Sequence, residues 1–280
     1  MNIDIDNSND NNEISPTFTT RIYNAKKKGR CVVLMIGGDF GKGKTTCAMQ
    51  LTYDIIHRFH PNKTPDELWT MVLGSIVFTR KQLKEALTRQ SREVNWKEIS
   101  PYEALQKAKD IRKDVIIWDD ASIHGSKHRR NERISYEIQS NFHQIRDATC
   151  CMIITLPESD DLLKSVREYR GLLLGEIDTQ RNATLNKLII YRRKVRAGRK
   201  SPWKGFIHSR EFPIRVDDNV YGEYYKLRNI AKIINIEEEE KRERFLETEM
   251  DYMEARRKHL LYKMKKYEVI PEEEASDVDS

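Results

Sequence analysis

The chain has 280 residues, about twice the length of an average domain, so it can bury a core without disulfides or metals. Hydrophobic residues make up 38% and charged residues 34%, a balance typical of a globular protein with charged helices. The longest apolar run, 31–36, is far shorter than the ~18 residues of a membrane span. The acidic N-terminus also lacks the basic and apolar segments of a signal peptide. We therefore expect no membrane span and a cytoplasmic location, with four buried, reduced cysteines.

The net charge of +6 conceals a strong asymmetry along the chain. Nine of the 44 acidic residues lie in two terminal segments, 1–13 and 269–280, which contain no Lys or Arg. Residues 14–268 therefore carry a formal charge of +15. A body this basic favours a nucleic-acid partner. Composition alone does not separate a DNA-binding protein from one that is only basic.

The first structured part of the chain contains a complete phosphate-binding motif. Residues 1–17 are rich in Asn, Asp and Ser and predict a disordered tail. Gly38–Thr45 then matches G-x-x-x-x-G-K-[ST], after a strand at 31–36 and before a helix that reaches about Phe59. The glycines let backbone N–H groups converge on phosphate oxygens, and the helix N-terminus adds its dipole.

This motif predicts ATP and Mg²⁺ as cofactors. We expect Lys44 to reach the β- and γ-phosphates and the Thr45 hydroxyl to bind Mg²⁺. The residues expected to contact the nucleotide are Gly38, Asp39, Phe40, Gly41, Lys42, Gly43, Lys44, Thr45 and Thr46.

Three further apolar segments, 75–78, 114–119 and 149–155, predict buried strands. Two intervening helices have clear start signals, Thr79 and Ser100, each followed three residues later by Gln or Glu as a capping-box partner. A helix is also expected between the strands that end at residues 119 and 155. Continuous apolar strands separated by helices indicate a parallel sheet covered on both faces.

Polar side chains stand at the ends of two of these strands. Asp119 is expected to hold the metal through water, and Asp120 to orient and deprotonate the attacking water. Thr155 is placed to bond that water or the γ-phosphate, although a polar strand end fits equally well. With Lys44, Asp120 and Thr155 form the predicted catalytic set. The alternative is that the acidic pair only ends a strand.

An arginine finger supplied to a neighbouring subunit is a further expectation for an ATPase ring. The candidates flanking the strand 149–155 are Arg146, Arg167 and Arg170. Ordinary surface arginines are the alternative interpretation.

The pattern changes after Arg170. Strands predicted at 171–177, 185–193 and 205–215 are joined by short polar segments without helices, which suggests an antiparallel extension of the sheet. Residues 219–264 read as helical, with one apolar face. That face contains Leu246, Met250, Met253, Leu260 and Met264.

Two basic clusters are candidate DNA contacts. The first lies between Tyr191 and Trp203, at the tip of a predicted hairpin where cations meet phosphates and aromatic rings stack on bases. Its candidates are Arg192, Arg193, Lys194, Arg196, Arg199 and Lys200. The second cluster follows the strand 114–119 and contains Lys127, Arg129 and Arg130. Neither contains a base-reading motif, so any binding is expected to be independent of sequence, and solvated loops are the alternative.

The chain resembles the ATPases of archaeal spindle-shaped viruses and related plasmids. The matching segments are Thr20–Lys26, Gly43–Thr46, Ile116–Ala121, Ile153–Pro157, Phe212–Pro213, Val220–Tyr224 and Arg228. That family has been described as similar to AAA-type replication initiators. The late antiparallel strands look more like the DNA-pumping ATPases of the FtsK and HerA type. The resemblance implies residence in the host cytoplasm.

We therefore expect an α/β fold of the P-loop NTPase type, a three-layer sandwich with a mostly parallel sheet. The predicted division of the chain has four segments. These are a tail at 1–17, an ATPase domain at 18–230 with a hairpin extension from 171, a charged amphipathic helix at 231–268 and an acidic tail at 269–280. The expected function is Mg²⁺-dependent ATP hydrolysis acting on DNA, in a homo-oligomeric ring. The alternatives are a nucleotide-dependent DNA-binding switch with little turnover and an adaptor whose P-loop only stabilises the fold.

Overall fold

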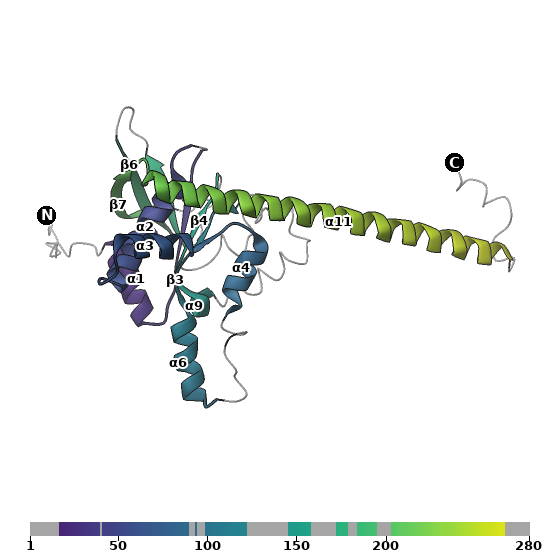
Figure 1. The fold of residues 1–280 in the computed structure, drawn as a ribbon, viewed down its shortest axis with the longest axis horizontal. Helices are drawn as coiled ribbons and strands as arrows, with labels where there is room; N and C mark the ends of the chain where they lie inside the picture. The colour runs from purple at the N-terminus through teal and green to yellow at the C-terminus, as the bar shows by residue number, and fades with distance from the viewer. Residues whose placement is uncertain are drawn as a thin grey trace, which may run out of the picture. The chain divides into compact units, whose positions relative to one another are not determined.

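The computed structural model describes residues 17–39, 41–89, 93, 99–121, 145–157, 172–178, 184–194 and 203–266 (Figure 1). The chain divides into two units, residues 1–226 and 227–280. The first unit contains α1 (Phe18–Lys27), β1 (Val32–Gly37), α2 (Lys44–Phe59), α3 (Pro65–Leu73), β2 (Ile76–Val77), α4 (Arg80–Leu87), α6 (Pro101–Ile111), β3 (Lys113–Trp118), α9 (Ile145–Ala148), β4 (Thr149–Thr155), β5 (Leu172–Asp178), β6 (Leu185–Lys194), β7 (Trp203–Pro213) and the first turns of α11 (Asp218–Lys266).

The centre of the first unit is a seven-stranded sheet with the order β2-β3-β4-β1-β5-β6-β7. The strands from β2 to β5 are parallel, whereas β6 pairs antiparallel with both β5 and β7. This confirms the predicted α/β fold class, with a mostly parallel central sheet and an antiparallel extension.

One predicted pairing was wrong. The strand predicted at 171–177 is not part of the antiparallel extension, because β5 pairs parallel with β1, with Leu174 opposite Met35. Residues 156–171 separate β4 from β5 and are long enough for the crossover of about a dozen residues that a parallel neighbour needs. The antiparallel part therefore begins at β6.

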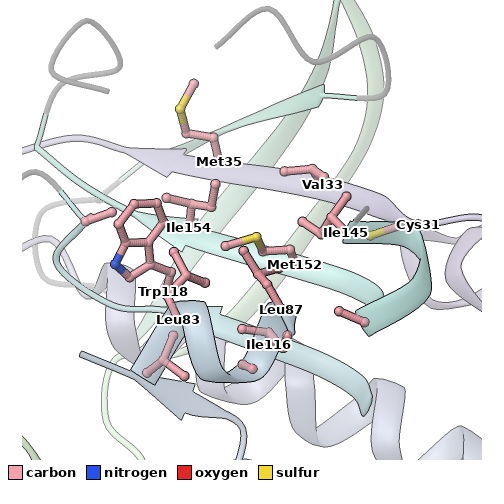
Figure 2. Packing of buried hydrophobic residues seen from close by; sticks show 14 of the residues in the cluster. Cys31, Val33, Met35, Leu83, Leu87, Ile116, Trp118, Ile145, Met152 and Ile154 are labelled. Carbon is pink, nitrogen blue, oxygen red and sulfur yellow. The ribbon is translucent and has the colours of Figure 1, made fainter. Parts of the chain in front are cut away.

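The sheet is covered on both faces, as the unbroken apolar strands require. Side chains that alternate along β1, β3 and β4 point to one face, where Leu83 and Leu87 of α4 and Ile145 of α9 pack against them (Figure 2). The intervening residues face the side on which α1 and α2 pack against the strands. Trp118 and Ile153 are fully buried. The parallel strands are thereby buried between two layers of helices.

The helix starts agree with their sequence signals. Thr79 and Gln82 form the predicted capping box of α4, and Ser100 with Glu103 forms that of α6. The predicted strand 205–215 lies two residues earlier, as β7. Helix α3 was not predicted, although Pro65 and a complete Thr64–Glu67 capping box mark its start.

Helix α11 has 49 residues and matches the helix predicted at 219–264. On its predicted apolar face, Met250 and Met253 are exposed, while the side chains of the other three residues lie outside the described part.

In the described part of the chain, no helix is long and apolar enough to cross a membrane. The four cysteines are buried and free, as predicted, and burial raises the pKa of Cys31 to about 12.

Candidate nucleotide-binding site

The loop between β1 and α2 has the backbone of an anion-binding turn. Gly38, Gly41 and Gly43 have φ angles of 138°, 79° and 79°, a region that residues with a side chain rarely adopt. Gly43 precedes α2 and has no side chain to cap the first-turn N–H groups, so these groups face the loop. Phe40, also predicted to contact nucleotide, lies outside the described residues.

Lys44, the first residue of α2, reaches back to the start of this loop. Its Nζ donates to the carbonyl oxygens of Gly38 at 2.6 Å and Asp39 at 2.8 Å. Partial burial lowers the pKa of Lys44, and the nearby Asp120 and Asp119 carboxylates oppose that shift. The ammonium therefore bonds the loop carbonyls and lies near the acidic strand end, where it can meet a phosphate.

Asp119 lies directly after β3 and is only 1% exposed. Its Oδ1 accepts hydrogen bonds from the hydroxyls of Thr45 at 2.8 Å and Thr155 at 2.7 Å. Its Oδ2 accepts one from the Tyr224 hydroxyl at 2.8 Å. The sheet thus brings Thr45, Asp119 and Thr155, predicted separately, into one hydrogen-bonded group, and adds Tyr224 from the start of α11.

The donor set of this group fits Mg²⁺. The Thr45 hydroxyl and Asp119 Oδ1 are hard oxygen groups 2.8 Å apart, of the kind that binds Mg²⁺ directly or through water. Within the described residues, no group of three or more His, Cys, Asp or Glu residues is arranged to hold a metal. In proteins Mg²⁺ usually keeps several waters and takes one or two protein ligands together with substrate phosphates.

Asp120 has a strained backbone next to the metal-binding candidate. Its φ is 53°, the only positive value at a described residue other than glycine. Its N–H donates to Thr155 Oγ1 at 2.9 Å. Because the Thr155 hydroxyl also donates to Asp119, it links the Asp119 carboxylate to the backbone of Asp120.

The antiparallel extension lies behind the loop, a contact that was not predicted. Asn186, on β6, is 5% exposed and donates from Nδ2 to the Lys42 carbonyl at 3.4 Å. A Cβ at Gly43 would lie 3.3 Å from the same nitrogen and 4.0 Å from Phe212 on β7. The extension therefore contacts the loop at Lys42 and Gly43, next to the start of α2.

Only some of the residues predicted as DNA contacts or arginine fingers lie in the described part of the chain. β6 and β7 pair as predicted for the hairpin, with exposed Arg192 opposite Gly205. Arg193 and Lys194 continue β6, but their side chains lie outside the described part. Arg146 lies on α9, just before β4, at the opposite sheet edge from Asp119. The remaining candidates lie outside the described residues: Arg196, Arg199, Lys200, Lys127, Arg129, Arg130, Arg167 and Arg170.

Comparison with known proteins gives one curated sequence relative and several distant structural likenesses. No protein-family model matches the chain. The uncharacterized protein B-251 of Sulfolobus spindle-shape virus 1 is 25% identical over 229 residues, covering 78% of this chain and 82% of B-251. Its source is a virus of the kind to which the sequence resemblance pointed. The expected likeness to FtsK and HerA stays a prediction.

Among solved structures, the N-terminal domain of zonular occludens toxin from Neisseria meningitidis has a TM-score of 0.35 at 16% identity, over 69% of this chain and 97% of that domain. The KaiC-like protein PH0186 from Pyrococcus horikoshii OT3 has a TM-score of 0.31 at 16% identity, over 66% and 90%. The genome packaging NTPase B204 of Sulfolobus turreted icosahedral virus 2, in complex with AMP, has 0.28 at 13%, over 55% and 78%. Scores this low transfer neither a site nor an activity to this chain.

Proposed function

We propose that this protein is a Mg²⁺-dependent ATPase that acts on DNA in packaging, translocation or replication-associated remodelling. The observation that carries the proposal is the hydrogen-bonded group of Thr45, Asp119 and Thr155 beside a complete P-loop. A loop that only stabilised the fold would not need a buried carboxylate, at 1% exposure, joined to the phosphate-binding helix.

Each residue of the site has a distinct task in this proposal. Lys44 exchanges its carbonyl partners for the β- and γ-phosphates, while the loop and first-turn N–H groups bond the phosphate oxygens. Thr45 and Asp119 hold Mg²⁺, which when bound neutralises charge on the phosphates. Asp120 accepts a proton from the attacking water and orients it, and Thr155 keeps Asp120 in place.

The DNA-directed part of the proposal rests on charge. Residues 14–268 carry +15, and the β6–β7 hairpin carries exposed Arg192 near its tip. Contacts from such a tip neutralise phosphates without reading bases. Assembly into a ring would give each site access to an arginine of a neighbouring subunit.

A second candidate function is a nucleotide-dependent DNA-binding switch with little turnover. The observation that favours it is the Thr155 hydroxyl, which donates to Asp119 and accepts from the Asp120 N–H. Because its one proton goes to Asp119, this hydroxyl cannot donate a hydrogen bond to the γ-phosphate or to an attacking water.

Multiple-turnover phosphate release, measured with and without DNA, separates the two candidates. The ATPase proposal predicts steady release that DNA accelerates. No release beyond one turnover, even with DNA and at high protein concentration, would favour the switch. The absence of any ATP binding would overturn both.

A further inference from the structure

Tyr224 connects the start of α11 to the metal-binding candidate. It is 1% exposed, and its hydroxyl lies 2.8 Å from Asp119 Oδ2. Its ring packs against Phe78, which follows β2, and against Tyr221 one turn earlier, with centroid distances of 5.8 and 5.7 Å. An aromatic residue in the core needs no hydroxyl, so the polar contact calls for its own explanation.

The acceptor positions of Asp119 supply that explanation. A carboxylate has roughly four lone-pair positions, two on each oxygen. In the described part of the chain, Thr45 and Thr155 use both positions on Oδ1, and Tyr224 uses one on Oδ2. The open position is on Oδ2, and Tyr224 fixes its direction.

We propose that Tyr224 is a positioning residue for Mg²⁺: it orients Asp119 so that the free lone pair of Oδ2 receives a water bound to the metal. Partners behind a metal-binding group commonly change metal affinity by ~10–100-fold. Coupling between two sites is reciprocal, so metal binding strengthens the Tyr224 contact by the same factor. Residues 218–226, the first turns of α11, therefore report whether the site holds Mg²⁺ with its nucleotide. The inference rests on the proposed nucleotide site.

The substitution Tyr224→Phe tests this role, because it removes the hydroxyl and keeps the ring. The measurement is the affinity of full-length protein for a non-hydrolysable ATP analogue, first in EDTA and then across a Mg²⁺ titration. We expect the affinity for the analogue in EDTA to stay within about twofold of the wild type. The Mg²⁺ concentration that gives half of the full increase in affinity should rise about tenfold. If the Mg²⁺ concentration needed for half of that increase is the same in the variant and the wild type, the inference is overturned.

Tyr221→Phe is the matched control. Tyr221 lies on the same helix and touches the Tyr224 ring, but it is 48% exposed and no hydrogen bond of its hydroxyl is found among the described residues. We expect it to titrate like the wild type. An equal loss in both variants would contradict a specific role for the Tyr224 hydroxyl.

A second measurement on the wild type covers the case in which Tyr224→Phe fails to fold. Hydrogen exchange of residues 218–226 is compared with the analogue in EDTA and with the analogue plus Mg²⁺. We expect slower exchange with Mg²⁺, and equal exchange would overturn the inference. A wild type that binds no analogue at all would instead contradict the proposed function.

Discussion

At the scale of single residues, Asp120 has the most unusual conformation. Its φ of 53° is one that Asn and Asp adopt more readily than other side-chain-bearing residues. Asp120→Asn therefore removes the charge without adding backbone strain. Because a general base contributes ~10²–10⁴-fold, we expect turnover to fall by that factor. ATP and Mg²⁺ should still bind, since Thr45 and Asp119 are unchanged.

The matched control for this substitution is Asp147→Asn. Asp147 is an exposed carboxylate on α9, before β4, at the opposite sheet edge from the site. Phosphate release by this variant should equal that of the wild type. A DNA-stimulated enzyme with full activity as Asp120→Asn would show that hydrolysis uses another base.

At the scale of elements, the antiparallel extension restricts the phosphate-binding loop. Gly43 and Gly29 both have positive φ, 79° and 61°, but a Cβ at Gly43 would lie 3.3 Å from Asn186 whereas one at Gly29 meets nothing within 4 Å. Gly29→Ala should cost ~1–2 kcal/mol of unfolding free energy from backbone strain alone. We expect Gly43→Ala to cost more and to weaken ATP binding. Urea unfolding and nucleotide titration measure these two effects.

Adding Asn186→Ala to Gly43→Ala isolates the crowding. Removing the amide opens the space that the new Cβ needs, so the double variant should be more stable than the sum of the single effects predicts. Strict additivity would show that Asn186 does not restrict the loop.

The elements that depend on local signals were predicted from the sequence. The strand, loop and helix from residue 31 to Phe59, and the capped start of α4 at Thr79, follow from short-range patterns. The parallel placement of β5 did not follow, because strand composition does not distinguish a parallel neighbour from an antiparallel one. Asn186 and Tyr224 were not predicted as site residues, because they reach the site through tertiary packing from β6 and α11.

At the scale of the whole molecule, the predicted partner follows from a basic body between acidic ends. Replacing Arg192, Arg193, Arg199 and Lys200 with Ala should weaken DNA binding and flatten its salt dependence. Each lost phosphate contact lowers the slope of log K against log salt by ~0.7–0.9. Four lost contacts would therefore lower it by roughly three. Binding titrations across a salt series measure this slope.

A control with the same change in net charge is Ala at Lys241, Arg244, Arg256 and Lys258, four exposed bases on α11. The hairpin proposal predicts the wild-type slope for this variant. A slope lowered only in the α11 variant would place the DNA contacts on that helix.

The central claim is that residues 38–45 hold ATP through Lys44. The most direct measurement is calorimetric titration of a non-hydrolysable ATP analogue with Mg²⁺ into wild type and Lys44→Ala. A charge-assisted hydrogen bond contributes ~1.5–3 kcal/mol, so we expect binding by the variant to be at least about tenfold weaker. The variant should keep its fold, because Lys44 is only partly buried and these hydrogen bonds go to two carbonyls of the loop itself. Equal affinity in two folded proteins would contradict the account.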